Sequence, residues 1–159
     1  MKKNIAILGS TGSIGQTTLE IINKKKEFFK DLILVANKNY NKINFQIKKY
    51  NPKIFIVTNK NTYLKIYKKF KRRSNIKIFN SFNELKFKNK LDITVSAIPG
   101  IAGLKPTIMF TKHSKKILLA NKESIICGWD LINKTSKKYK TKFIPIDSEH
   151  FSIWSLIKN

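Results

Sequence analysis

The sequence predicts an α/β fold in which helices cover both faces of a doubly wound, mostly parallel sheet. Short β-rich runs alternate strictly with longer amphipathic stretches along the 159 residues, and this alternation is typical of doubly wound domains. Several short runs are continuously apolar, such as Ile33-Leu34-Val35 and Ile54-Phe55-Ile56-Val57. Strands that are buried on both faces have this composition, because helices cover both sides of a parallel sheet.

Each expected strand is a short β-rich run, and the seven runs in chain order are residues 4–8, 32–36, 53–57, 76–79, 92–97, 116–120 and 142–146. Each expected helix is an amphipathic stretch between two of them: residues 14–25, 41–50, 61–71, 82–87, 104–111 and 122–139. No linker or repeat divides the chain, so we expect one domain over residues 1–150. Residues 151–159 resemble the start of another helix, which we interpret as the beginning of a truncated following region.

The chain is strongly basic, with 33 Lys and Arg residues against 9 Asp and Glu residues and a formal net charge of +24. Such a charge is typical of proteins that bind nucleic acid or an anionic membrane. Arginine, the residue suited to bidentate recognition, occurs only at Arg72 and Arg73, and the lysines are spread along the whole chain. We therefore interpret the charge as a compositional bias, with a basic nucleic-acid-binding module as the alternative. The sequence contains no run of about 18 uncharged apolar residues, so it predicts no transmembrane helix.

A glycine-rich loop, Gly9-Ser10-Thr11-Gly12-Ser13-Ile14-Gly15, joins the first expected strand to the first expected helix. Its glycines permit a tight turn at Gly9, close approach of the backbone to a pyrophosphate at Gly12, and close packing of the helix at Gly15. The helix N-terminus adds unpaired N–H groups and a positive dipole end. An ordinary Gly/Ser turn is the alternative, but the position between strand and helix favours a Rossmann-like dinucleotide-binding domain.

The end of the second expected strand bears on the choice of dinucleotide. NAD-binding domains usually carry Asp or Glu there, which binds the ribose hydroxyls. This strand runs instead into Asn37-Lys38-Asn39, which has no carboxylate to repel a 2′-phosphate and supplies a cation at Lys38. The segment favours NADP(H), unless Lys38 is one more surface lysine in a lysine-rich chain.

Two further polar segments follow expected strands, at the edge where open α/β sheets bind ligands. They are Asn121-Lys122-Glu123 and Asp147-Ser148-Glu149. Asp147 and Glu149 are two residues apart, so in an extended segment their carboxylates face the same side and can share Mg²⁺ or Mn²⁺. Lys122 can hold an anionic or hydroxyl-bearing substrate. The alternative is that both segments are ordinary helix starts.

Three other residues are expected to have structural roles. Cys127 lies in an apolar stretch and is expected in the core, and Trp129 is expected to pack against other side chains. His113 follows an expected helix and is expected to be solvated at the helix C-terminus.

The glycine loop, residues 118–124 and residues 145–150 together resemble 1-deoxy-D-xylulose 5-phosphate reductoisomerases, in order and in spacing. The resemblance covers the whole chain, but only the N-terminal, NADPH-binding part of that family. It implies that Asp147 and Glu149 bind the metal, that Lys122, Ser148 and Glu149 bind the substrate, and that Lys122 and Glu149 act in catalysis. The implied cofactor contacts are Thr11, Gly12, Ser13, Ile14, Asn37, Lys38, Asn39, Asn121 and Glu123.

The resemblance also implies a reaction. The carbon skeleton of 1-deoxy-D-xylulose 5-phosphate is rearranged, and NADPH reduces the resulting aldehyde to 2-C-methyl-D-erythritol 4-phosphate, in the non-mevalonate isoprenoid pathway. A divalent metal, Mg²⁺ or Mn²⁺, stabilises oxyanion charge on the substrate, and the nicotinamide delivers hydride.

The same resemblance bears on partners and completeness. It implies a phosphosugar substrate, a homodimer of the complete enzyme, a location in a bacterial cytoplasm or a plastid-type organelle, and no nucleic-acid or membrane partner. Family members are much longer than this chain, so we expect an incomplete enzyme that is inactive by itself. The alternative is a remnant that binds NADPH without turnover.

Overall fold

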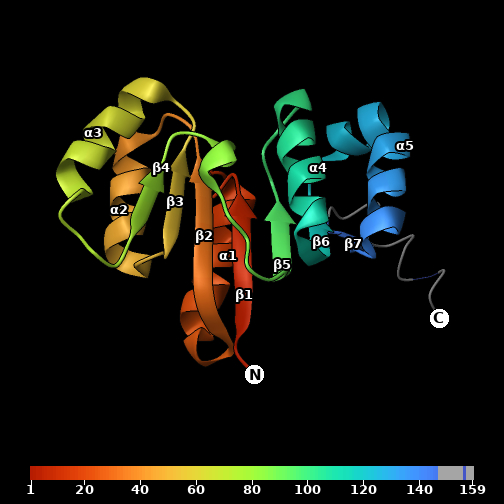
Figure 1. Cartoon of the computed structure of the whole chain (residues 1–159), viewed down its shortest axis with the longest axis horizontal. Coiled ribbons are helices and arrows are strands. Elements are labelled where there is room, and N and C mark those ends of the chain that lie inside the picture. Colours follow the sequence, from red (N-terminus) through yellow and green to blue (C-terminus); the bar gives the residue numbers. More distant parts are fainter. Residues whose placement is uncertain (147–155, 157–159) are drawn as a thin grey trace.

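The computed structural model of the chain describes residues 1–146 and 156. In this part, the strands form one parallel sheet in the order β4-β3-β2-β1-β5-β6-β7 (Figure 1). The strands are β1 (Lys3–Leu8), β2 (Phe29–Ala36), β3 (Ile54–Val57), β4 (Lys77–Phe79), β5 (Leu91–Ser96), β6 (Ser114–Leu119) and β7 (Lys142–Pro145). All seven expected strands are confirmed, and so is the Rossmann-like, doubly wound class.

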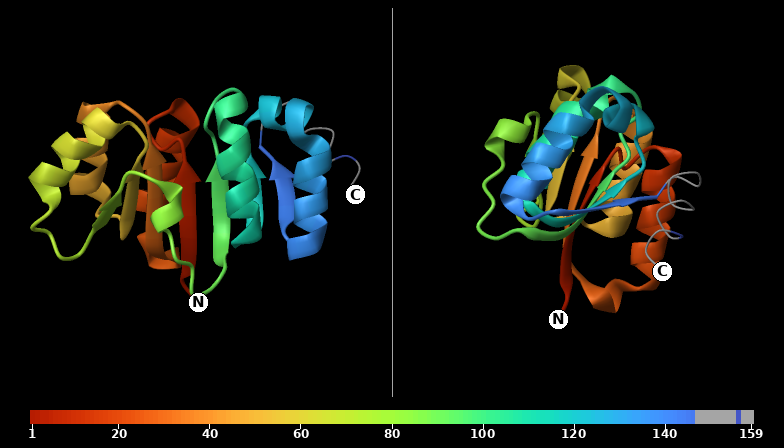
Figure 2. Two further views of the ribbon diagram at one scale, coloured as in Figure 1. Left: turned by 45° about the horizontal axis from the view of Figure 1, so that its top comes forward. Right: turned by 90° about the vertical axis from the view of Figure 1, so that its right-hand side faces the viewer.

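Helices cover both faces of the sheet, as the two views of Figure 2 show. The α-helices are α1 (Ser13–Lys24), α2 (Tyr40–Tyr50), α3 (Lys60–Phe70), α4 (Leu104–Lys112) and α5 (Lys122–Tyr139), and the 3-10 turns are η1 (Lys26–Phe28), η2 (Phe82–Glu84) and η3 (Ile101–Gly103). None of the helices in the described residues is long and apolar enough to span a membrane.

The core has two layers, one on each face of the sheet. Buried side chains of α1, α2 and α3 pack with Ile5 and Ile7 of β1, whereas Phe110 of α4 packs with Ala6 and Leu8 of the same strand. Successive residues of a strand point to opposite faces, so the buried residues of β1, from Ile5 to Leu8, are all apolar because both faces of the strand are covered there. The strand order reverses between β1 and β5, and such a reversal leaves a crevice at the carboxyl ends of the strands.

The expected helix over residues 82–87 was wrong. Only one turn forms there, η2, and it is closed by a capping box between Ser81 and Glu84. Leu85 is already extended, with φ −74° and ψ 125°. The apolar residues of the segment serve a different purpose, because the rings of Phe82 and Phe87 meet Phe110 edge-on at 6.2 and 5.7 Å. An irregular segment that covers the core therefore carries an apolar spacing like that of a helix.

The expected core position of Cys127 was also wrong, because its side chain is exposed. Trp129, which was expected to pack against other side chains, is exposed as well. The buried positions of α5 are Ser124, Gly128, Ile132 and Thr135. Gly128 has non-helical φ and ψ values of −137° and 18°, and the side chain of Leu104 occupies the space where a Cβ would lie. The resulting register turns the neighbours of Gly128 outward.

His113 ends α4 and is less solvated than its position suggested. Its ring stacks on Phe87, with 4.5 Å between centroids and 20° between planes. Partial burial, and then the positive charges of Lys112 and Lys90, hold the pKa of His113 below its usual value. The unfolded chain therefore binds a proton at His113 more readily than the folded chain does.

A pH dependence of stability follows from this lowered pKa. We expect the free energy of unfolding to fall as pH decreases from about 6.5, the ordinary histidine pKa, to the pKa of His113 in the folded protein. A His113→Phe variant keeps the stacking on Phe87 and should remove this part of the slope. Urea unfolding at a series of pH values measures it, and identical slopes for the two proteins would contradict the assignment.

Candidate functional site

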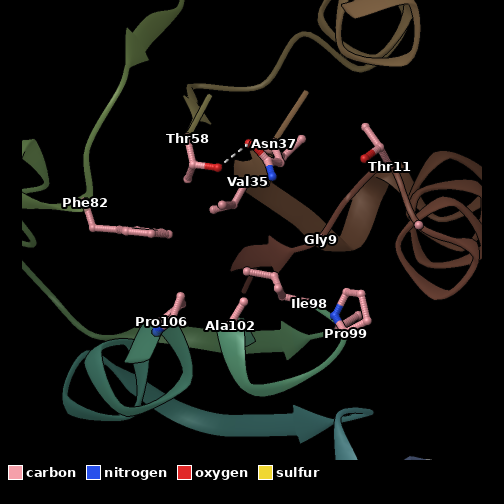
Figure 3. Close-up of a pocket in the computed structure, with 13 residues that line it drawn as sticks. Gly9, Thr11, Val35, Asn37, Thr58, Phe82, Ile98, Pro99, Ala102 and Pro106 are labelled. Carbon is pink, nitrogen blue, oxygen red and sulfur yellow. Dashed lines mark hydrogen bonds between the residues drawn. The ribbon is translucent and has the colours of Figure 1, made fainter. Parts of the chain in front are cut away.

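Two neighbouring cavities open at the carboxyl edge of the sheet, where the strand order reverses. The larger encloses about 510 Å³ and the smaller about 360 Å³. Figure 3 shows the larger one, with Val35 and Thr58 on one side, Ala102 and Pro106 on the opposite side, and Phe82 between them. Both cavities are lined by Gly12 and by the segment Ala97-Ile98-Pro99 after β5. They therefore form two compartments that meet at the glycine loop.

The backbone of the glycine loop explains two of its glycines. Gly9 has φ +85°, and a Cβ there would lie 2.5 Å from the carbonyl oxygen of Ala97. A Cβ on Gly15 would lie 2.6 Å from the Cα of Ser10. The expected tight turn at Gly9 and close packing at Gly15 are confirmed.

Gly12 lies in a different environment, because a Cβ there would meet only the carbonyl oxygen of Gly9, at 3.4 Å. It is the N-cap of α1, and within the described residues no side chain caps this helix. The first turn of α1 also holds no acidic residue. Because the first N–H groups of a helix have no intrahelical partner, the start of α1 offers donors and a positive dipole end to an anion between the two cavities.

A buried pair of side chains fixes the glycine loop to α2. The hydroxyl of Ser10 donates to Gln46 Oε1 at 2.8 Å, and Gln46 Nε2 donates to the carbonyl oxygen of Ser10 at 2.7 Å. Ser10 and Gln46 are 0% and 2% exposed. Buried polar groups that are fully paired favour one geometry over others, so Gln46 holds the loop in its present shape.

We expect a Gln46→Leu variant to lose roughly 2–5 kcal/mol of unfolding free energy, because two buried polar groups of Ser10 lose their partner. Denaturant unfolding measures this loss. Adding Ser10→Ala removes one of the two unpaired groups and should restore part of the stability. A Gln46→Leu variant as stable as the parent would show that the pair does not hold the loop.

In the segment after β2, one residue lines the larger cavity and the next two make hydrogen bonds within the fold. Asn37 lines the larger cavity, and Lys38 is exposed while its carbonyl oxygen accepts from Thr62 Oγ1 at 3.2 Å. Asn39 is the N-cap of α2, and its side chain accepts from the backbone N–H of Lys42 at 3.1 Å. Part of the hydrogen-bonding capacity of Asn39 is thus used to start α2.

Asn121 joins the two loops that border the smaller cavity. It is 2% exposed and is the N-cap of α5, where its Oδ1 accepts from the backbone N–H of Ser124 at 2.8 Å. Its Nδ2 donates to the carbonyl oxygen of Gly100 at 2.9 Å and also to that of Ile98. The side chain therefore fixes the start of α5 to the loop after β5, a positioning role that the sequence did not reveal.

The structure describes only some of the other predicted site residues. Lys122 and Glu123 line it together with Ser13 and Ile14, so the structure brings the glycine loop and this segment together. Asp147, Ser148 and Glu149 lie outside the described residues. Among residues 1–146 and 156, no three metal-ligating side chains gather.

The chain matches the family model of 1-deoxy-D-xylulose 5-phosphate reductoisomerase over residues 5–128. The chain belongs to this family. The reductoisomerase of Pelagibacter ubique is 52% identical over 161 residues, which cover 99% of this chain and 41% of that protein. That of Clostridium novyi is 38% identical and is covered to 42%. The chain thus spans about two fifths of the length of these reductoisomerases.

Solved reductoisomerases share its fold. A crystal structure of DOX-P reductoisomerase in complex with magnesium has a TM-score of 0.84 at 32% identity, over 94% of this chain and 38% of that one. The reductoisomerase from Zymomonas mobilis in complex with NADPH has a TM-score of 0.85 at 29% identity, over 94% of this chain and 40% of that one. The resemblance drawn from three sequence segments is confirmed.

Proposed function

We propose that residues 1–150 form the NADPH-binding domain of a 1-deoxy-D-xylulose 5-phosphate reductoisomerase. The observation that carries this proposal is the pair of cavities that meet at Gly12. A dinucleotide consists of two nucleosides joined by a pyrophosphate, and two compartments joined at an uncapped helix start match this division. The complex of the Zymomonas mobilis relative with NADPH supports the choice of cofactor.

The larger cavity is the better place for the adenosine half. Its walls are mainly apolar, with Val35, Phe82 and Pro106 around a space that suits a flat ring, and Asn37 and Thr58 add polar atoms. In this proposal Asn37, Lys38 and Asn39 bind the ribose and its 2′-phosphate. The backbone of Thr11, Gly12, Ser13 and Ile14 binds the pyrophosphate.

The smaller cavity receives the nicotinamide half, with Asn121 and Glu123 at the cofactor and Lys122 at the substrate. Lys122 is exposed, so its ammonium can meet a phosphosugar that enters from solvent. We further propose that Asp147 and Glu149 bind Mg²⁺ or Mn²⁺ and that Ser148 and Glu149 contact the substrate. Carboxylates suit these hard cations, and a magnesium complex of a relative supports a metal in this family.

The proposed reaction converts 1-deoxy-D-xylulose 5-phosphate to 2-C-methyl-D-erythritol 4-phosphate in the non-mevalonate isoprenoid pathway. Bound NADPH supplies hydride, and a divalent metal stabilises developing negative charge. The residues of this chain bind the cofactor, orient it through the fixed loops at Ser10 and Asn121, and hold the substrate at Lys122. We propose that the complete protein is a homodimer in a bacterial cytoplasm or a plastid-type organelle, and that residues 151–159 begin its next region.

An assay of the chain alone tests this proposal. With NADPH, Mn²⁺ and the phosphosugar present, we expect NADPH to bind but the nicotinamide absorbance to stay constant. The same chain extended by the remaining part of a reductoisomerase should oxidise NADPH. Failure of the isolated chain to bind NADPH would contradict the proposal, and failure of the extended protein to turn over would favour the remnant that binds NADPH without catalysis.

The net charge of +24 favours one other function, a basic nucleic-acid-binding module. Binding of this kind weakens steeply with salt, because captured phosphates release counterions. Titration of duplex DNA at several salt concentrations tests it. Weak binding with a flat salt dependence would exclude electrostatic capture of nucleic acid.

A further inference from the structure

A lysine of α2, Lys42, contacts the glycine loop. Lys42 lies in the first turn of α2, and its Nζ donates to the carbonyl oxygen of Thr11 at 3.2 Å. The side chain of Asn39 accepts a hydrogen bond from the backbone N–H of Lys42. Because side chains of a helix lean toward its N-terminus, this cap fixes the point from which Lys42 reaches the loop.

The charge around Lys42 is one-sided. In the described part of the chain, the salt bridges join Lys53 to Asp31 and Lys115 to Asp92, and Lys42 takes part in neither. The sequence has no Asp or Glu between residues 32 and 83, and the first turn of α1 has none. An ammonium group and the positive dipole ends of two helices thus lie close together, an arrangement that an anion between them would stabilise.

The position of Lys42 indicates which phosphate of the cofactor it would meet. Thr11, which its Nζ contacts, lines the larger cavity, and so does Asn37 at the end of β2. In dinucleotide-binding domains the end of the second strand meets the adenosine ribose, where NADPH carries its 2′-phosphate. Lys38 and Lys42 both lie at the start of α2, on the two sides of the cap residue Asn39.

We propose that Lys42 binds the 2′-phosphate of NADPH together with Lys38, and that it is a residue that determines the preference for NADPH over NADH. This inference rests on the proposed function. The Nζ leaves the Thr11 carbonyl for the phosphate, because a charge-assisted hydrogen bond to a phosphate is stronger than one to a neutral carbonyl. No bond other than hydrogen bonds is made or broken.

Three variants of the full chain test the inference, with NADPH and NADH titrated separately against each. Lys42→Gln removes the charge, keeps a side chain that suits a helix and should weaken NADPH binding about 10- to 100-fold, with less than about a 2-fold change for NADH. Lys42→Arg keeps the charge and should restore NADPH binding to within about 3-fold. Lys48→Gln alters an exposed lysine in the last turn of α2 and should change neither affinity.

The outcomes separate this inference from the proposed function. If the parent chain binds NADPH but Lys42→Gln binds it equally well, or loses NADPH and NADH to the same degree, Lys42 does not read the 2′-phosphate and the cofactor proposal stands. If the parent chain binds no NADPH, both proposals fail. An unchanged unfolding midpoint of Lys42→Gln shows that any loss comes from the ligand contact.

Discussion

Replacement of Gly12 by Asp should abolish NADPH binding without unfolding the chain. Gly12 has extended φ and ψ values of −75° and 172°, which any residue can adopt, and a Cβ there meets no atom closer than 3.4 Å. The new carboxylate would lie at the start of α1, at the point where both cavities meet. It would occupy the place of the pyrophosphate and repel it, so we expect a loss of NADPH affinity of at least about 100-fold.

The same substitution should raise stability, and this opposite sign makes the test sharp. Asp is a better N-cap than Gly by a few tenths of a kcal/mol, and its charge interacts favourably with the helix dipole. Together these effects amount to about 0.5–1 kcal/mol, or roughly 1–4 °C in the unfolding midpoint of a chain of this size. Calorimetric titration and thermal unfolding measure the two effects.

A Gly12→Ser variant is the matched control, because Ser caps the helix without adding charge. It should be slightly more stable than the parent and lose less affinity for NADPH than the Asp variant. If Gly12→Asp bound NADPH like the parent, the pyrophosphate would not lie at the start of α1. If it lost binding only because it unfolded, the proposed open space at Gly12 would be wrong.

Phe110→Ala should cause the largest loss of stability among the substitutions considered. Phe110 is fully buried, and it supports Phe82 and Phe87 in edge-on contacts. Removal of a buried phenyl ring costs about 3–5 kcal/mol, a large part of the roughly 5–15 kcal/mol that stabilises a typical domain. Phe82 also lines the larger cavity, so the variant should bind NADPH several-fold more weakly.

Denaturant unfolding measures this effect, with Phe28→Ala as the control. Phe28 is 55% exposed, and its truncation should change the unfolding free energy by less than about 0.5 kcal/mol. A loss below about 1 kcal/mol for Phe110→Ala would contradict the packing described for α4 and η2.

The strands could be predicted because the parallel sheet is covered on both faces, so strands carry continuous apolar runs such as Ile33-Leu34-Val35 and Ile54-Phe55-Ile56-Val57. The predictions for residues 82–87 and for Cys127 were wrong because the apolar residues there do not follow the pattern of a regular helix. Phe82 and Phe87 pack against Phe110 from a segment of irregular backbone, so their spacing does not indicate a helix. Cys127 lies in an apolar stretch, but the non-helical Gly128 beside it sets a register that exposes the thiol.

The candidate site also has residues that could be predicted from the sequence and residues that could not. The glycine loop is a local pattern, so its turn at Gly9 and its close packing at Gly15 follow from sequence. Gln46 and Phe82 reach the site only through the fold, from α2 and from the segment after β4. Nothing in the sequence around them marks a binding site, because their partners lie tens of residues away.

We propose that a dinucleotide binds across the two cavities at the carboxyl edge of the sheet. Amide chemical shifts of the isotope-labelled chain, recorded during titration with NADPH, test it most directly. We expect the shifts to change at Thr11, Gly12, Asn37, Ile98 and Asn121, which line the two cavities. Absence of changes there, or changes gathered on the lysine-rich helix α3 instead, would contradict the assignment of this edge as the cofactor site.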